Sequence, residues 1–307
     1  MIKKISTADR EAWKSLRHGY IGGSDAASVV GLNPFKSAYA LWAEKTDKAP
    51  SFGGNLATEV GTFLEEFVAQ KFAEQTRKKV RKVNQSFLND AYPFAIANID
   101  RDIVGEDAGL EIKTTSEMNL TKFKNGEYPA NYYVQCVHYL AVTGKAKWYL
   151  AVLIGNREFR TFEIERDEAE INALMNAEKD FWELVKTDTP PAPDGSDSTS
   201  ETISVIYPES DDETVDLTAY EGDMKQYIAL TSQIKGLTAI KDELANKVKA
   251  YMGKAGRGVS EGFKVAYTSS VRNTFDAKRF SADYPNMDLS GYYKQSSVRT
   301  FRLTEIN

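Results

Sequence analysis

The sequence contains one cysteine, Cys136, and two histidines among 307 residues. A single cysteine excludes an internal disulfide, a cysteine-based zinc site and a four-cysteine iron–sulfur cluster, and two histidines argue against a histidine-rich metal site. Long apolar runs are also missing, because the longest, residues 148–154, is far shorter than the roughly 20 residues of a membrane helix. The first residues lack the apolar stretch of a secretory signal. We therefore expect a soluble cytoplasmic protein with no membrane contact.

Basic residues are missing from one segment of the chain. Residues 187–224 contain no Lys or Arg, and they begin TDTPPAPDGSDSTSE, a composition typical of an exposed linker. Residues 225–307 instead hold 14 basic and 7 acidic residues. The net charge of −5 therefore reflects one segment and says little about partners. We predict a domain of residues 1–188, an acidic Pro/Ser-rich linker of 189–216 and a C-terminal accessory module of 217–307.

Apolar spacing before the linker alternates between the periods of helices and strands. Hydrophobic residues make up 42% of the chain, enough for a sizeable core. Helices are predicted over 59–74, 128–143 and 168–186, and strands over 80–88, 94–98, 109–113, 148–153 and 159–164. This order predicts an α/β core with a central mixed sheet flanked by helices. After the linker, a heptad-like stripe over 227–251 predicts a long helix followed by a small β module, and this helix could pack on its own domain or form an intermolecular coiled coil.

The stretch ANIDRDIVGEDAGLEIK, residues 97–113, carries the acidic residues best suited to chemistry. Asp100 follows one predicted strand and Glu111 lies on the next, so a hairpin can bring the two carboxylates together. Side chains alternate along a strand, so Lys113 points to the same face as Glu111. Two carboxylates and a main-chain carbonyl form a site suited to Mg²⁺ or Mn²⁺. Lys113 beside such a metal could orient a water for phosphodiester hydrolysis. Asp102 shares the strand face of Asp100 and is the main alternative ligand.

Five stretches in a fixed order make this interpretation more specific. They are EAWKSLRHGYIGGSDAA, LNPFKSAYALWAEKT, GTFLEEFVAQKF, the NID…GLEIK segment, and NYYVQCVHYLAVTG followed by WYLAVL. Together, over about residues 10–185, they resemble the YqaJ-like viral recombinases and lambda-type exonucleases of the PD-(D/E)XK nuclease superfamily. The resemblance implies a restriction-endonuclease-like core. One departure is Ile99, which stands where the superfamily has a proline before the first acid.

The resemblance assigns a metal centre to the acidic stretch. It implies that Asp100, Glu111 and the carbonyl of Ile112 bind the metal and that Lys113 is the catalytic lysine. Glu65 matches the acid of the first core helix, which faces the metals directly or through water. Only one of Glu65 and its neighbour should face the site, because adjacent helical residues point in different directions. A solvent-exposed helix charge is the plainer interpretation of Glu65.

The resemblance also implies contacts with DNA. Gln135 matches a glutamine that binds DNA phosphate or supports the catalytic strand. Arg17 and Ser24 match the pair that holds the 5′-terminal phosphate, and a guanidinium can grip phosphate oxygens with two donors. The plainer alternatives are a hydrogen-bonded helix residue for Gln135, a surface ion pair for Arg17 and a helix N-cap for Ser24. Further candidate DNA contacts are the basic residues of 77–82 and the group Lys36, Lys45 and Lys48.

These features and the resemblance predict a Mg²⁺-dependent 5′–3′ exonuclease of double-stranded DNA that leaves 3′ overhangs for phage-type recombination, with Mn²⁺ as a substitute for Mg²⁺. The resemblance implies double-stranded DNA ends and a single-strand annealing recombinase as partners. It also implies a homo-oligomer, often a trimeric ring, in the cytoplasm of a bacterial host carrying a phage or prophage. The alternatives are an endonuclease or single-strand nuclease of the same superfamily, or a non-catalytic DNA-binding or assembly protein that acts through residues 217–307.

Overall fold

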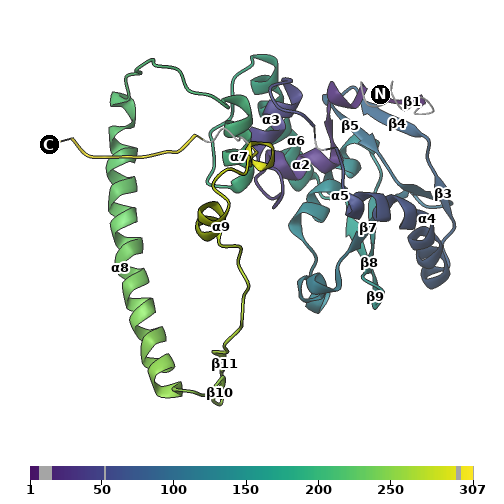
Figure 1. Cartoon of the computed structure of the whole chain (residues 1–307). Helices are drawn as coiled ribbons and strands as arrows, with labels where there is room; N and C mark the ends of the chain where they lie inside the picture. The colour runs from purple at the N-terminus through teal and green to yellow at the C-terminus, as the bar shows by residue number, and fades with distance from the viewer. Residues whose placement is uncertain (7–15, 52, 295–298, 307) are drawn as a thin grey trace. The chain divides into compact units, whose positions relative to one another are not determined.

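The computed structural model describes residues 1–6, 16–51, 53–294 and 299–306 (Figure 1). Within these ranges the chain divides into two units, Met1–Tyr207 and Pro208–Asn307. No helix in the described part of the chain is long and apolar enough to cross a membrane.

A five-stranded mixed sheet forms the centre of the first unit. Its strands follow the order β3-β6-β7-β8-β9 and span Val80–Lys82, Arg101–Ile103, Ala108–Thr115, Lys147–Ile154 and Glu158–Glu165. β7 and β8 are parallel, whereas the other neighbours are antiparallel. β8 reads KWYLAVLI, an almost continuous apolar run, because both faces of the sheet are covered.

Helices cover the two faces of this sheet. Val68, Ala69 and Phe72 of α4 (Leu56–Thr76) pack with Tyr149 and Ala151 of β8. The alternate β8 residues, including Trp148 and Leu150, instead belong to the core that contains α5 (Ala130–Thr143). Because side chains alternate along a strand, α4 and α5 lie on opposite faces. The predicted α/β core with a mixed sheet flanked by helices is therefore confirmed.

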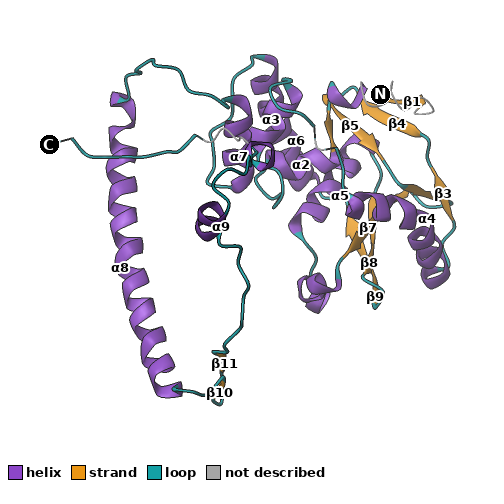
Figure 2. Ribbon diagram, in the orientation of Figure 1, coloured by secondary structure: helices purple, strands orange, loops and turns teal. Residues whose placement is uncertain are grey.

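A second, four-stranded sheet adjoins the α5 side of the core (Figure 2). Its order is β1-β4-β5-β2, with bounds Ile2–Ser6, Gln85–Asn89, Tyr92–Asn98 and Ile21–Gly22. The remaining elements of this layer are α2 (Gly23–Val29), α3 (Ala38–Lys45), η1 (Glu117–Gly126) and α6 (Glu168–Lys186). The single strand predicted over 80–88 is wrong, because β3 and β4 belong to different sheets and residues 83–84 pass between them.

The segment predicted as a linker contains a packed helix. α7 (Asp197–Ile206) begins after the N-cap Ser196 and buries Thr199 and Thr202. The Thr199 hydroxyl donates to Ser37 Oγ at 2.8 Å, next to the start of α3. The predicted linker of 189–216 therefore differs from the structure over 197–206, because small hydroxyl side chains bury there while the acidic ones stay outside.

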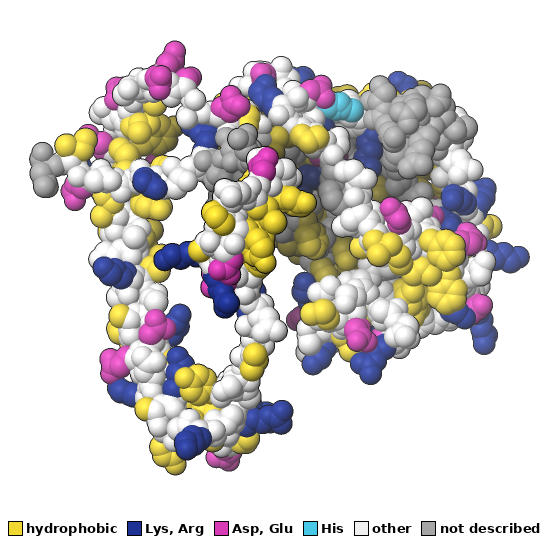
Figure 3. Space-filling model, viewed as in Figure 1, with side chains coloured by type: hydrophobic (Ala, Val, Ile, Leu, Met, Phe, Trp, Pro, Cys, Tyr) yellow, Lys and Arg dark blue, Asp and Glu magenta, His cyan; other side chains and the backbone are white. Residues whose placement is uncertain are grey.

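The second unit is built on one long helix. α8 spans Glu221–Met252 after the short η2 (Thr218–Tyr220), and β10 (Arg257–Val259) and β11 (Lys264–Ala266) form an antiparallel hairpin. α9 (Ala277–Asp283) and η3 (Ser290–Tyr292) follow. The apolar stripe of α8 is largely exposed, and Figure 3 shows hydrophobic side chains along this helix. The Tyr227 ring packs edge-on against Phe301, with 5.6 Å between the ring centroids.

Candidate active site

One cavity of the first unit brings together every site residue predicted from the sequence. It has a volume of about 800 Å³, and its walls include Arg17, Ser24, Glu65, Asp100, Glu111, Ile112, Lys113 and Gln135. These residues come from α2, α4, α5, β7, the helical residues 16–18 and the connection between β5 and β6. The predicted metal group and the predicted phosphate group therefore share one cavity.

The register of two strands places the acids side by side. β6 pairs antiparallel with β7, with Arg101 opposite Leu110, so Asp100 just before β6 is next to Glu111. The Ile112 N–H donates to Asp100 Oδ2 at 2.7 Å. The expected hairpin is present, but its first strand is β6 and not the predicted strand of 94–98, which is β5 of the other sheet.

The two acids are buried next to each other. Burial raises the pKa of Asp100 well above its ordinary value, and the charge of Glu111 raises it further. Burial also raises the pKa of Glu111, although the Lys113 charge opposes that effect. Glu111 Oε2 is buried and has no hydrogen-bond partner. Two crowded carboxylates and an orphaned carboxylate oxygen are the donor set that a hard divalent cation would satisfy.

A polar network holds Lys113 against the acids. Its Nζ lies 2.6 Å from Glu111 Oε1 and donates to Gln135 Oε1 at 2.8 Å. Burial by itself would lower the pKa of Lys113, but the Glu111 charge holds it above its ordinary value. Gln135 Nε2 in turn donates to Glu111 Oε1 and to Tyr139 Oη, each at 2.8 Å. Tyr139 also lines the cavity; it lies in the NYYVQCVHYLAVTG stretch, where the sequence assigned a role only to Gln135.

Glu65 is bound by a residue that sequence reasoning missed. The buried Arg101 guanidinium contacts the carboxylates of both Glu65 and Glu66, and its Nη1 also donates to the Asp100 carbonyl at 2.7 Å. Glu65 lines the cavity and Glu66 does not, in line with the expectation that only one would face it. In the described ranges no group of three or more His, Cys, Asp or Glu side chains is arranged to hold a metal. Of the three acids in the cavity lining, Asp100 and Glu111 are adjacent across the strand pair, whereas Glu65 is paired with Arg101.

Asp102, the alternative to Asp100, is engaged elsewhere. Its carboxylate lies 2.7 Å from Arg81 and 2.8 Å from Lys145, and it is not part of the cavity wall. Of the two acids in or next to β6, Asp100 is therefore the one that faces the cavity.

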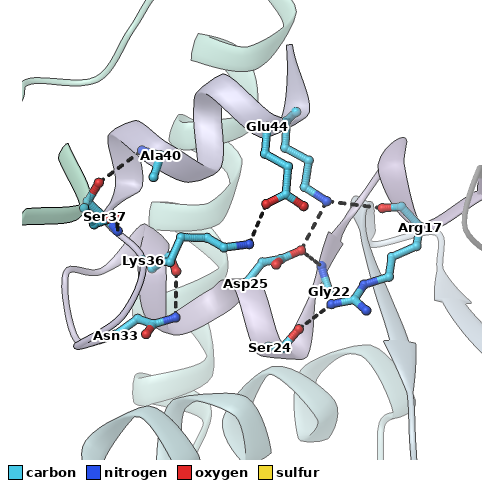
Figure 4. A network of polar contacts seen from close by, with 12 residues as sticks. Arg17, Gly22, Ser24, Asp25, Asn33, Lys36, Ser37, Ala40 and Glu44 are labelled. Carbon is cyan, nitrogen blue, oxygen red and sulfur yellow. Dashed lines mark hydrogen bonds and ion pairs between the residues drawn. The ribbon is translucent and has the colours of Figure 1, made fainter. Parts of the chain in front are cut away.

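The cavity lining also includes Arg17 and Ser24. Arg17 Nη2 donates to Ser24 Oγ at 2.6 Å, as Figure 4 shows. Ser24 lies within the first turn of α2, and the N-cap is Gly22, so Ser24 is not a helix cap. The two polar side chains therefore meet in the cavity that also holds the acids.

Comparison with known proteins identifies the family. Residues 12–146 match the family model described as a YqaJ-like viral recombinase domain, and all eight predicted site residues fall within this range. An uncharacterised protein YqaJ of Bacillus subtilis (strain 168) is 36% identical over 313 residues, covering 100% of this chain and 98% of the relative. The chain belongs to the YqaJ family.

Other proteins resemble this YqaJ-family chain over a shorter stretch or at lower sequence identity. Protein D345L of African swine fever virus is 44% identical over 55 residues, 18% of this chain and 16% of the viral protein. Among solved structures, the alkaline exonuclease LHK-Exo of Laribacter hongkongensis has a TM-score of 0.47 and 20% identity, with 58% of this chain and 93% of that chain covered. The same enzyme in complex with dAMP gives a TM-score of 0.49 over the same shares.

Proposed function

We propose that this YqaJ-family chain is a Mg²⁺-dependent exonuclease that degrades one strand of duplex DNA from the 5′ end and leaves a 3′ overhang. The observation that carries the proposal is the shared cavity, whose lining includes both a buried acid pair with an adjacent lysine and an arginine–serine pair. The first group suits phosphodiester hydrolysis, and the second suits an anchored phosphate.

The acid pair fits a divalent cation. Asp100, Glu111 and the main-chain carbonyl of Ile112 would hold Mg²⁺, or Mn²⁺ in its place, and the unpartnered Glu111 Oε2 supports this assignment. A bound divalent ion supplies a water of lowered pKa and neutralises charge on the scissile phosphate. Glu65, on the same cavity wall, would contribute through water while it remains bound to Arg101.

The other side chains of this wall orient the reacting groups. The Lys113 ammonium donates toward Gln135 and Glu111, which keeps its positive charge at the acid pair where the scissile phosphate must approach. Gln135 holds both the amine and Glu111 in one geometry. A fixed geometry lowers the reorganisation that the reaction requires.

Arg17 and Ser24 would set the register on DNA. A guanidinium and a hydroxyl at the cavity wall can together bind two of the three non-bridging oxygens of a terminal phosphate. Anchoring the 5′ end in this way favours cleavage at ends over internal cleavage, which gives the 5′–3′ direction.

The family resemblance supports three further parts of the proposal. The substrate would be the end of double-stranded DNA, and the 3′ strand would pass to a single-strand annealing recombinase. A homo-oligomer, such as a trimeric ring around DNA, would keep the enzyme on its substrate. Cytoplasmic action in a bacterial host of phage or prophage origin fits the same role.

A time course on linear duplexes tests the proposal. The full chain is incubated with 5′-phosphorylated and 5′-hydroxyl duplexes in Mg²⁺, Ca²⁺ or EDTA, and with closed circular DNA. We expect cleavage in Mg²⁺ only, faster on the 5′-phosphorylated ends and absent on circles. Equal cleavage of circles would support an endonuclease, and binding without cleavage under every condition would support the non-catalytic alternative.

A further inference from the structure

Lys45 carries a buried ammonium that faces away from solvent. It is the last residue of α3, and its side chain is 3% exposed. Its Nζ donates to the Tyr20 carbonyl at 2.7 Å and the Arg17 carbonyl at 3.2 Å, and lies 3.1 Å from Asp25 Oδ2. An ammonium has three donors, so all of them are used inside the protein. The expectation that Lys45 contacts DNA is therefore wrong.

Asp25 completes the link to the next element. Its carboxylate is also buried, and Oδ2 accepts from the Gly22 N–H at 3.2 Å (Figure 4). Burial by itself would raise the pKa of Asp25, but the Lys45 and Arg17 charges hold it below its ordinary value. The carboxylate therefore stays ionised and keeps its two partners.

These contacts tie together the two ends of one short turn. Lys45 donates hydrogen bonds to the carbonyls of residues 17 and 20, and Asp25 accepts one from the N–H of residue 22. The turn between them carries Arg17 at its start, and Ser24 follows its end. The Arg17 guanidinium then reaches Ser24 Oγ across a distance of 2.6 Å. A buried ion pair adds little net stability, because desolvation offsets the attraction of the charges, so its main effect here is on position.

We propose that Lys45, through Asp25, is the positioning residue that gives the cavity its preference for a 5′-phosphorylated DNA end. It touches no DNA and acts by holding Arg17 and Ser24 at one separation. This inference rests on the proposed phosphate-anchoring function of that pair. A displacement of about 1 Å in a binding group can cost on the order of 100-fold in rate, so a loosened turn would be measurable.

The test compares ratios of kcat/KM for 5′-phosphorylated and 5′-hydroxyl duplexes. The variants are Lys45→Met, Lys45→Arg, Asp25→Asn and Arg17→Ala in the full chain, each checked for folding by circular dichroism. Lys145→Met is the matched control, because it breaks another poorly exposed ion pair, with Asp102 at 2.8 Å, away from the turn. Affinity for both ends in Ca²⁺, measured by fluorescence anisotropy, gives a readout that does not require turnover.

We expect Lys45→Met and Asp25→Asn to lower the ratio about 10-fold or more toward the value of Arg17→Ala, mainly through KM, while cleavage of 5′-hydroxyl ends persists. Lys45→Arg should restore most of the ratio, and Lys145→Met should keep it. If Arg17→Ala loses the preference while Lys45→Met keeps it, the positioning role is overturned and the phosphate site stands. If Lys45→Met does not fold, the decisive variant is Asp25→Asn. A folded Asp25→Asn protein with the wild-type ratio of kcat/KM values also overturns the positioning role of Lys45. A wild-type protein with no preference overturns both the phosphate site and the role of Lys45.

Discussion

Lys113 and Gln135 converge on one oxygen atom. Lys113 Nζ lies 2.6 Å from Glu111 Oε1, and Gln135 Nε2 donates to the same atom at 2.8 Å. The amide oxygen of Gln135 accepts from Lys113 at 2.8 Å, which closes a triangle of polar contacts. The second oxygen of Glu111 is left without a partner, so this triangle presents it for a ligand.

Removing the amide should loosen this triangle. Gln135→Ala should lower kcat by about 10- to 100-fold with little change in KM for duplex DNA, because Gln135 orients reacting groups more than it binds substrate. Steady-state kinetics on 5′-phosphorylated duplexes check this. Tyr139→Phe, which removes only one contact to Gln135, should cost less. A large rise in KM with unchanged kcat would instead make Gln135 a DNA-binding residue.

Removing one acidic charge should abolish metal binding. Glu111→Gln keeps the volume of the side chain but leaves Asp100 as the only acid of the pair, so we expect Mg²⁺ binding by isothermal titration calorimetry to disappear. Activity should fall by on the order of 100- to 1,000-fold or more. Glu66→Gln, whose side chain lies outside the cavity wall, is the control. Unchanged Mg²⁺ affinity in Glu111→Gln would exclude this pair as the metal centre.

Arg101 should be a large single contributor to stability. Arg101→Met removes the buried cation shared by two carboxylates of α4, which themselves keep access to solvent, so we expect a loss of about 1.5–3 kcal/mol in the free energy of unfolding. Urea titration measures it. Lys71→Met, which breaks an exposed pair with Glu74, should change it by less than about 1 kcal/mol. Equal small losses in both variants would contradict the structural role of Arg101.

Gly23 leaves room for one aromatic ring. A Cβ at this position would lie 2.5 Å from the Tyr139 ring, so Gly23→Ala should displace Tyr139 and cost about 1–3 kcal/mol of stability together with much of the activity. Gly222→Ala, where a Cβ meets open space, should leave the first unit unaffected. Tyr139→Leu combined with Gly23→Ala should recover stability if the clash is the cause. Thermal unfolding of the three variants decides this.

A buried His138–Glu178 pair should make stability depend on pH. Burial by itself would lower the pKa of His138, but Glu178, 2.8 Å from Nδ1, raises it above its ordinary value of about 6.5. The folded protein then holds this proton more tightly than the unfolded chain does. The resulting stability is fully present below about pH 6.5 and is lost as the pH rises through the folded pKa. Burial also raises the pKa of Glu178 above its ordinary 4.5, against the opposing His138 charge, so its contribution also declines with pH but begins to do so at about pH 4.5.

The measurement is the free energy of unfolding in urea at several pH values between 5 and 9. His138→Gln should remove much of the decline at the alkaline end. A wild-type stability that rises with pH over this range would be the opposite of the expected sign.

The sequence by itself determined the local features of this protein. The predicted helix of 168–186 has those same bounds, because Asp167 caps its first turn and apolar residues recur at helical spacing. Alternation along β7 placed Glu111 and Lys113 on one face without any knowledge of the fold. The ordered motifs added Arg17, Ser24, Glu65 and Gln135, which line the same cavity.

Only the tertiary structure decided which of several equivalent partners each charged residue takes. Alternation along a strand predicts one face for Asp100 and Asp102, yet Asp102 pairs with Arg81 and Lys145 while Asp100 faces the cavity. Lys45 is buried on backbone carbonyls, although its neighbours in sequence suggested a DNA contact. The partner of each charged residue comes from a part of the chain that is distant in sequence and is brought close by sheet register and helix packing. Local sequence patterns do not contain this information about spatial neighbours.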